Sequence, residues 1–409
     1  MSHNYSDHTL PLDGVRVLDL TTMVSGPIAT MLLAEQGADV IKIESPTGDY
    51  MRRVGTEHKG MTSSFLTCNR GKRSMCVDIK QPKGLELVLE LAKNADVLVQ
   101  NFRPGVIERM GLGEDAVRAL RPDIIYMSIS GFGKTGPQAH QRVYDPVIQA
   151  LSGLADVQRD QVSGVPRMVR TIICDKTTAL TAAHAITTAL FHRERTGQGQ
   201  FLDLAMVDCI FHHHEIALQA WHLSDGDFVP QRMGKHQELV FPVGLFRGPD
   251  DWIAMLALDF QWENVCRAMG RIDWITDPRY AEMSDRAERK DELIPVIEEW
   301  MSTFETNEAL LNHLEEYRVP ASPVLSSLDA IDHPHFNARE MVRWVEDPIH
   351  GSVPIPGFPW KFSAGGQLPE LVAPLLGEHN AEILKTKLGY SSDQVEDLER
   401  SGILLDGPT

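Results

Sequence analysis

The sequence predicts an α/β protein with a large domain, built on a mostly parallel sheet, and a smaller α+β domain. Two observations carry this expectation. Short apolar runs alternate with helical stretches up to about residue 130, and a hairpin pattern replaces that alternation after residue 239. The chain has 409 residues, 43% of them hydrophobic, which is enough for two or three domains. We expect a large domain over 1–225, a small domain over 240–325 and a return segment over 326–409 that completes the large domain.

Strands and helices are expected to alternate strictly in the first part of the chain. Residues 15–20 and 38–43 are expected as strands, and the helix between them begins at Ser25-Gly-Pro27 and covers 28–36, which makes a βαβ unit. The alternation continues as strand 74–78, helix 82–94, strand 97–99, helix 106–110 and strand 124–130. Repeated alternation gives a Rossmann-like, mostly parallel sheet with helices on both faces.

The next segment places a single carboxylate at a helix start. Residues 168–174 are expected as a strand and 177–191 as a helix, so Asp175 lies on the link between them. The positive end of a helix stabilises a carboxylate as the anion, the form that attacks a carbonyl. An aspartate before Thr-Thr is also a common N-cap, and this pattern leaves both roles open. Its neighbour Cys174 is expected to pack in the core.

The remaining elements predict a change of architecture. Strand 200–204 and a long helix over 207–221 come first, and the turn Gly248-Pro-Asp-Asp251 between apolar 239–246 and 252–258 then predicts a hairpin. Helices of the small domain are expected over 261–269, 291–304 and 307–317. The proline-rich residues 341–359 predict a strand pair or an extended return connection, and helices over 379–388 and 392–401 close the chain.

Composition excludes several classes of protein. A net charge of −18 argues against a nucleic-acid partner. The N-terminal stretch MSHNYSDHTLPL has no basic segment followed by an apolar one, so we expect a cytoplasmic protein without signal peptide or membrane anchor. Five cysteines without a CxxC pair fit reduced thiols and argue against structural zinc. His212, His213 and His214 would point about 100° apart on a helix, so no metal site is expected.

The first βαβ unit does not predict a dinucleotide site. Glu44 ends the second strand as in dinucleotide-binding folds, but the turn over 21–27 holds one glycine and no GxGxxG. Nicotinamide and flavin cofactors are therefore not expected. Positive side chains gather where predicted strands begin or end, namely Lys72, Arg73, Lys80, Arg103, Arg109, Lys134 and Arg142. Local positive charge of this kind suits an anionic substrate despite the negative total charge, but scattered surface charge would also account for any one of these residues.

Five segments, taken in order, resemble the family III CoA-transferases. They read LDGVRVLDLTTMVSGPIATMLLAEQGADVIKIE, CNRGKRSMCVDIK, ADVLVQNFRPGVIERMG, SGFGKTGPQAHQRVYDPVIQALSG and VPRMVRTIICDKTTALTAAHAITTALFHRERTGQGQFLDLAMVD. This is the family of the formyl-CoA, carnitine and benzylsuccinate CoA-transferases. The resemblance runs from Leu12 to about Leu388.

The resemblance implies an enzyme that moves coenzyme A from an acyl-CoA donor to a free carboxylic acid. CoA thioesters would be its substrates, with no tightly bound cofactor. Asp175 would attack the donor to form an aspartyl-acyl anhydride and would then carry coenzyme A as an aspartyl-CoA thioester. Succinyl-CoA is the expected donor, because relatives without a glycine-rich loop commonly use a dicarboxylic one. The resemblance also implies an interlocked homodimer, in which two chains thread through each other.

Family contacts to coenzyme A fall on segments at the ends of predicted strands. They are Val24, Ser25, Val77, Asp78, Ile79, Lys80, Asn101, Phe102, Arg103, Arg109, Arg142, Val143, Tyr144 and Asp145. Arginine and lysine suit phosphates, and Tyr144 is expected near the reacting end. Formyl-CoA transferase has a glutamine at the position of Val24 and a run of glycines in the loop over 231–244, which here holds only Gly234 and Gly244. These departures argue against oxalate and formyl-CoA as substrates.

Two alternatives remain beside the transferase. An acyl-CoA α-carbon racemase or epimerase uses a histidine and an aspartate, but the histidine position falls on Val143-Tyr144-Asp145, and a phenol is a poor base near neutral pH. The other alternative is a noncatalytic subunit of a heteromeric CoA-transferase. The presence of Asp175 argues against it.

Overall fold

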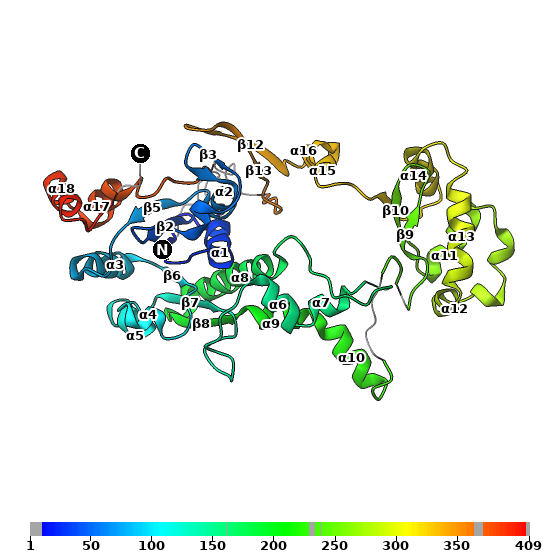
Figure 1. Cartoon of the computed structure of the whole chain (residues 1–409), viewed down its shortest axis with the longest axis horizontal. Helices are drawn as coiled ribbons and strands as arrows, with labels where there is room; N and C mark the ends of the chain where they lie inside the picture. Colours follow the sequence, from blue (N-terminus) through cyan, green and yellow to red (C-terminus); the bar gives the residue numbers. More distant parts are fainter. Residues whose placement is uncertain (1–9, 161, 229–233, 238, 364–370, 406–409) are drawn as a thin grey trace. The chain divides into compact units, whose positions relative to one another are not determined.

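The computed structural model describes residues 10–160, 162–228, 234–237, 239–363 and 371–405. Its chain divides into two compact units, whose elements are labelled in Figure 1. Unit 1 comprises Met1–Gly153, Val169–Ile216 and Arg339–Thr409, and unit 2 comprises Leu154–Met168 and Ala217–Ala338. Among the helices of the described ranges, none is both long and apolar enough to cross a bilayer.

Unit 1 is built on a parallel sheet of six strands. They are β1 (Arg16–Asp19), β2 (Asp39–Glu44), β5 (Arg73–Cys76), β6 (Val97–Gln100), β7 (Ile125–Ser130) and β8 (Gln200–Ala205). Their order is β5-β2-β1-β6-β7-β8, and all neighbouring pairs are parallel. This is the strand order of the Rossmann fold, in which the winding reverses between β1 and β6. The predicted α/β class with a mostly parallel sheet is confirmed.

Helices and two small hairpins accompany this sheet. The helices are α1 (Ser25–Ala34), α2 (Ser63–Asn69), α3 (Pro82–Asn94), α4 (Val106–Arg109), α5 (Glu114–Leu120), α6 (Asp145–Leu151), α8 (Ile173–Thr196), α9 (Met206–Phe211), α17 (Asn380–Leu388) and α18 (Ser392–Arg400). The hairpins pair β3 (Glu57–His58) with β4 (Met61–Thr62), and β12 (Val342–Asp347) with β13 (Gly351–Pro356). The second hairpin is the strand pair that the proline-rich residues 341–359 predict.

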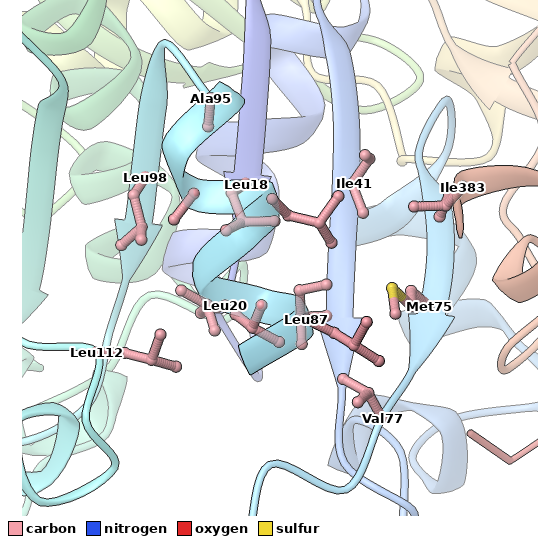
Figure 2. Packing of buried hydrophobic residues seen from close by; sticks show 14 of the residues in the cluster. Leu18, Leu20, Ile41, Met75, Val77, Leu87, Ala95, Leu98, Leu112 and Ile383 are labelled. Atoms are coloured by element: carbon pink, nitrogen blue, oxygen red, sulfur yellow. The ribbon is translucent and has the colours of Figure 1, made fainter. Parts of the chain in front are cut away.

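A hydrophobic core fills the space between the sheet and α3. Figure 2 shows Leu18, Ile41, Met75 and Leu98, which come from four neighbouring strands, packed with Leu87 of α3. The buried positions of α3 follow helical i, i+3, i+4 and i+7 spacing, so one stripe of this helix faces the sheet.

The opposite face of the sheet is covered by α1. All ten residues of α1 are buried, because it contacts α2 and α8 as well as the strands. An apolar sequence on every side of a helix is typical of such an enclosed position. Asp19 alternates with Leu18 along β1 and faces α1, where the Thr30 hydroxyl donates to Asp19 Oδ2 at 2.7 Å.

The C-terminal part of the chain completes unit 1 beside the edge strand β5. Cys76 N–H donates to Asn380 Oδ1 at 2.9 Å across 304 residues of sequence. Asp78 N–H donates to the Ile403 carbonyl at 2.9 Å, and Ile383 lies in the same core as Leu87. Figure 1 shows α17, near the C-terminal end, lying next to β5.

Unit 2 combines a three-stranded antiparallel sheet with helices. The strands are β9 (Val243–Arg247), β10 (Trp252–Leu256) and β11 (Ala321–Pro323), in the order β11-β10-β9. The helices are α7 (Leu154–Val157), α11 (Asp259–Ala268), α12 (Met283–Glu288), α13 (Lys290–Met301), α14 (Asn307–Glu316), α15 (Asp329–Asp332) and α16 (Pro334–Ala338). The predicted hairpin and small α+β region are confirmed.

A fully buried guanidinium lies at the centre of unit 2. Arg286 donates to the carbonyls of Phe241 at 2.9 Å and Tyr280 at 2.8 Å, and to Asp259 Oδ1 at 2.5 Å. A buried charge is stable only when its donors are paired in this way. Arg286, on α12, therefore joins the segment before β9 to the start of α11.

Two expected elements are wrong. Residues 168–174, all of which the structure describes, form no strand, because the backbone of Val169 bonds to the Gln149 side chain instead of a neighbouring strand. The long helix over 207–221 is interrupted, because a 3₁₀ turn at His212–His214 separates α9 from α10 (Glu215–Leu223). Within the described ranges no group of three or more His, Cys, Asp or Glu side chains could hold a metal ion.

Candidate functional site

A cavity of about 370 Å³ lies at the carboxyl ends of β1, β6 and β7 in unit 1. Open parallel sheets bind ligands where the strand order reverses, and that point lies here between β1 and β6. The lining residues come from the end of β7, from the segments after these strands, from the starts of α1, α8 and α9, and from the segment before α6. They are Thr22, Met23, Ser25, Asn101, Arg103, Ile129, Ser130, Gly131, Arg142, Val143, Tyr144, Asp175 and Met206.

Asp175 is the third residue of α8 and lines this cavity, half-buried. Burial, followed by the nearby negative charge of Asp145, raises the pKa of its carboxyl from 3.8 to about 6, against hydrogen bonds from Ser25 that lower the pKa. The side chain is thus mainly ionised at pH 7 yet more basic than an exposed aspartate. A strongly raised pKa in a cavity is typical of a functional site.

The N-cap role considered for Asp175 is wrong. The N-cap position of α8 is Ile172, which makes no capping bond through its side chain. The amides of Cys174 and Asp175 both donate to Asp145 Oδ2, at 2.8 Å and 3.2 Å. Asp145 therefore caps α8 from another element, and the carboxylate of Asp175 is left facing the cavity.

Two non-glycine residues with left-handed backbone flank the cavity. Ile172, at the start of α8, has φ 47°, and Met23, in the cavity wall, has φ 70°. Such backbone costs about 1–3 kcal/mol and persists only where neighbours fix it. For Met23 one such neighbour is Asp49, whose Oδ1 accepts the Met23 N–H at 3.1 Å. Strain of this kind clusters at functional sites.

The predicted site residues fall into three groups. Seven line the first cavity: Ser25, Asn101, Arg103, Arg142, Val143, Tyr144 and Asp175. Val77, Ile79 and Phe102 line a second cavity of about 150 Å³, which shares Thr22 with the first. Val24, Asp78, Lys80, Arg109 and Asp145 line neither. Contacts of all these residues with coenzyme A remain predictions.

The basic residues separate into free and structural groups. The exposed side chains of Arg103 and Arg142 form no ion pair or hydrogen bond with any residue that the structure describes. Lys72, by contrast, is buried and donates to Asp19 Oδ2 at 2.8 Å, and burial lowers its pKa to about 8. Arg73 pairs with Asp39 and Glu382. Lys72 and Arg73 therefore stabilise the fold and are not available to a ligand.

The sequence interpretation missed several lining residues, among them Met23, Ser130 and Gly131. Ser130 ends a predicted strand and Gly131 follows it, which is a usual place for a site and could have pointed to both residues. The Ser130 hydroxyl is buried and has no hydrogen-bond partner within the described ranges. A Cβ on Gly131 would lie 2.0 Å from Val143 Cγ1, so this wall requires glycine. No sequence signal marks Met23.

A half-buried carboxylate of raised pKa, free guanidinium groups and a cavity at the switch point of a Rossmann-like sheet define an enzyme that takes an anionic substrate. The chain belongs to CoA-transferase family III, whose family model matches residues 12–380. It is therefore a CoA-transferase, and the resemblance seen in the five sequence segments is confirmed.

Known relatives match both units of the chain. A succinyl-CoA:mesaconate CoA-transferase of Haloarcula hispanica is 37% identical over 398 residues, covering 94% of this chain and 98% of the relative. A formyl-CoA:oxalate CoA-transferase of Bradyrhizobium sp. is 35% identical, covering 97% and 98%. Among solved structures, a CAIB/BAIF family protein from Brucella suis has a TM-score of 0.81 at 32% identity, covering 93% of this chain and all of that one. A protein from Mycobacterium tuberculosis also has a TM-score of 0.81, at 29% identity, covering 91% and 99%.

Proposed function

We propose that this CoA-transferase works by covalent catalysis on Asp175. The observation that carries the proposal is the position of this carboxylate, which is half-buried in a cavity at the strand ends and is ionised at neutral pH. Transfer of coenzyme A between two acids must conserve the free energy of the thioester bond, so hydrolysis by water must be prevented. A carboxylate nucleophile in a partly closed cavity meets that requirement.

The reaction proceeds through four exchanges at carbonyl carbons. The Asp175 carboxylate attacks the donor thioester, which gives an aspartyl-acyl anhydride and releases CoA thiolate. The thiolate attacks the aspartyl carbonyl, so that the donor acid leaves and an aspartyl-CoA thioester forms. The acceptor carboxylate then attacks this thioester and displaces the thiolate again. Attack of the thiolate on the acceptor carbonyl gives the new acyl-CoA and frees Asp175.

In this proposal the thioester occupies the first cavity. The rest of coenzyme A extends past Thr22 to the second cavity, whose apolar wall of Val77, Ile79 and Phe102 suits the adenine ring. The free guanidinium groups of Arg103 and Arg142 suit its phosphates. Succinyl-CoA is the proposed donor, because a 37% identical relative is named a succinyl-CoA:mesaconate CoA-transferase.

Each tetrahedral intermediate carries an oxyanion that requires hydrogen-bond donors. The hydroxyl of Ser130 is a suitable donor, because it is buried in the cavity wall and no described residue accepts from it. A buried hydroxyl left unpaired in the free protein is stabilised when the oxyanion forms.

The test is exchange by the purified chain alone. Succinyl-CoA and a panel of carboxylic acids are incubated with the protein, and new acyl-CoA products are identified by mass spectrometry. The variant Asp175→Ala should lose at least about three orders of magnitude in kcat. Asp115→Ala, which removes an exposed carboxylate in the first turn of α5, is the matched control and should keep full activity. Hydroxylamine present during turnover should modify Asp175.

More than a tenth of the wild-type activity in folded Asp175→Ala would contradict the mechanism. Absence of exchange by the pure wild-type chain, together with activity after addition of a paralogous chain, would instead support the heteromeric alternative.

We propose further that the chain acts as a homodimer, in the interlocked form that the resemblance implies. Large apolar side chains on three helices of unit 1 are 45–63% exposed: Val147, Leu151, Leu180, Phe191 and Phe211. Exposed apolar groups of this size are common at protein interfaces. Light scattering should give twice 45.7 kDa even at nanomolar concentration. A stable folded monomer would contradict the interlocked form.

A further inference from the structure

We propose that Asp145 and Gln149 of α6 are positioning residues, which hold the first turn of α8 in the place where Asp175 faces the cavity. The inference rests on the proposed role of Asp175 as nucleophile. Asp145 Oδ2 accepts the amides of Cys174 and Asp175, and its Oδ1 accepts from Gln149 Nε2 at 2.5 Å. The geometry thus joins one side chain of α6 directly to the backbone of the nucleophile.

Gln149 extends this connection to the segment before α8. Its Oε1 accepts the Val169 N–H at 2.8 Å, and its Nε2 donates to the Val169 carbonyl at 3.0 Å. Asp145 and Gln149 are four residues apart on α6 and therefore share one helix face. Together they hold the chain on both sides of the turn that leads into Asp175.

Both side chains are buried and line neither of the two cavities. Asp145 is 3% exposed and Gln149 is 2% exposed. Both oxygens of Asp145 and both polar atoms of Gln149 are bonded within the protein. They therefore act on the reaction through Asp175 and its backbone.

The start of α8 depends on this external cap. Ile172 occupies the N-cap position with left-handed backbone and offers no polar side chain, so α8 cannot cap itself. The first amides of a helix need acceptors, and Asp145 supplies one acceptor atom to two of them. Small displacements of a nucleophile lower the rate strongly, so loss of this cap should reduce kcat.

Asp145 also acts through its charge. Its carboxylate lies next to Asp175 and disfavours the ionised form, which helps to keep the pKa of Asp175 near 6. Within the described ranges, Cys68 on α2 and Cys174 on the same helix are the other titratable groups that interact electrostatically with Asp175, and Arg103, Arg142 and Tyr144 line its cavity. Burial raises the pKa of Cys68 to about 11 and that of Cys174 to about 12, so neither thiol titrates near pH 6.

Three variants separate the two effects. Asp145→Asn keeps an acceptor for the α8 amides but removes the charge, and it turns an NH₂ group toward the NH₂ group of Gln149. Gln149→Ala keeps the charge and removes the link to Val169. Asp115→Asn makes the same charge change at the exposed start of α5, away from the cavity lining.

The readout is the pH profile of kcat/KM for succinyl-CoA exchange from pH 5 to 9. Asp145→Asn should move the acid limb to lower pH and lower kcat at pH 7 at least about tenfold. Gln149→Ala should lower kcat about tenfold and leave the acid limb in place, with little change in KM. Asp115→Asn should match the wild type in the position of the acid limb, in kcat and in KM.

An unmoved acid limb and a wild-type kcat in folded Asp145→Asn would overturn the inference. If that variant does not fold, Gln149→Ala decides alone, and a wild-type kcat there refutes the positioning role. The two proposals fail on different results. An active Asp175→Ala variant would refute the proposed role of Asp175 as nucleophile. An inactive Asp175→Ala variant, together with an Asp145→Asn variant that behaves as the wild type, would refute only the positioning role.

Discussion

Replacing Asp175 with asparagine should make unit 1 more stable at neutral pH while it abolishes transfer. Burial and the charge of Asp145 raise the pKa of this carboxyl from 3.8 to about 6, so the folded state holds the proton more tightly than the unfolded state. At about 1.4 kcal/mol per pH unit, ionised Asp175 costs the fold about 3 kcal/mol at pH 7. Asparagine carries no charge, and its carbonyl oxygen still accepts from Ser25.

The sign of the pH dependence follows from the raised pKa. The cost is fully present above the folded pKa of about 6 and shrinks as the pH falls, because the folded carboxyl then takes up its proton first. The cost in folding free energy amounts to about 1.6 kcal/mol at pH 5 and vanishes below the pKa of 3.8 that the carboxyl has in the unfolded state. The advantage of Asp175→Asn over the wild type should therefore fall by about half between pH 7 and pH 5.

Hydrogen exchange measured by mass spectrometry suits this test, because a chain with two units does not unfold in one step. Peptides from β1, β6 and α8 report the opening free energy of unit 1 alone, after correction for the intrinsic exchange rate at each pH. Asp115→Asn serves as control and should change that free energy by less than about 0.5 kcal/mol at every pH. If Asp175→Asn is no more stable than the wild type at pH 7, or if its advantage is the same at pH 5, the reasoning is refuted.

Three further substitutions test other parts of the molecule. Ser130→Ala removes the unpaired hydroxyl of the cavity wall and should lower kcat about 100-fold with KM within twofold; steady-state kinetics with an unchanged kcat would exclude its role at the oxyanion. Asp19→Asn leaves the buried ammonium of Lys72 without its anionic partner and should destabilise unit 1 by about 3–5 kcal/mol, as measured by hydrogen exchange in β1 at pH 7; a loss under about 1 kcal/mol would contradict this. Arg286→Leu leaves Asp259 and three carbonyls without their donor and should speed exchange in β9 and α11 of unit 2 by at least about 100-fold; unchanged exchange there would show that the pairing is dispensable.

Much of unit 1 could be predicted because its strands and helices leave clear local patterns. The strand β6 is buried on both faces and appears as the apolar run Val97–Val99, and β7 is mostly buried and mostly apolar. Helix α3 matches its expected bounds of 82–94, because Pro82 occupies the first turn and apolar residues follow helical spacing.

Elements that depend on tertiary contacts could not be predicted in the same way. The apolar run 168–174 resembles a strand, but Met168 is 57% exposed and Val169 is bound by Gln149. Apolar content alone does not distinguish a loop beside a cavity from a buried strand. The cap of α8 by Asp145 joins residues 29 positions apart, and only the packing of α6 against α8 brings them together.

The edge strand β5 has a consequence for synthesis on the ribosome. Its partners α17 and Leu405 leave the ribosome about 300 residues after it, as the bond between Cys76 and Asn380 across 304 residues shows. At about 5–20 residues per second, that edge stays uncovered for roughly 15–60 s. An open parallel edge is prone to pairing with other chains during that time. Truncation before α17 should therefore yield aggregated protein, and a chaperone that shields nascent chains should raise the yield of the full chain.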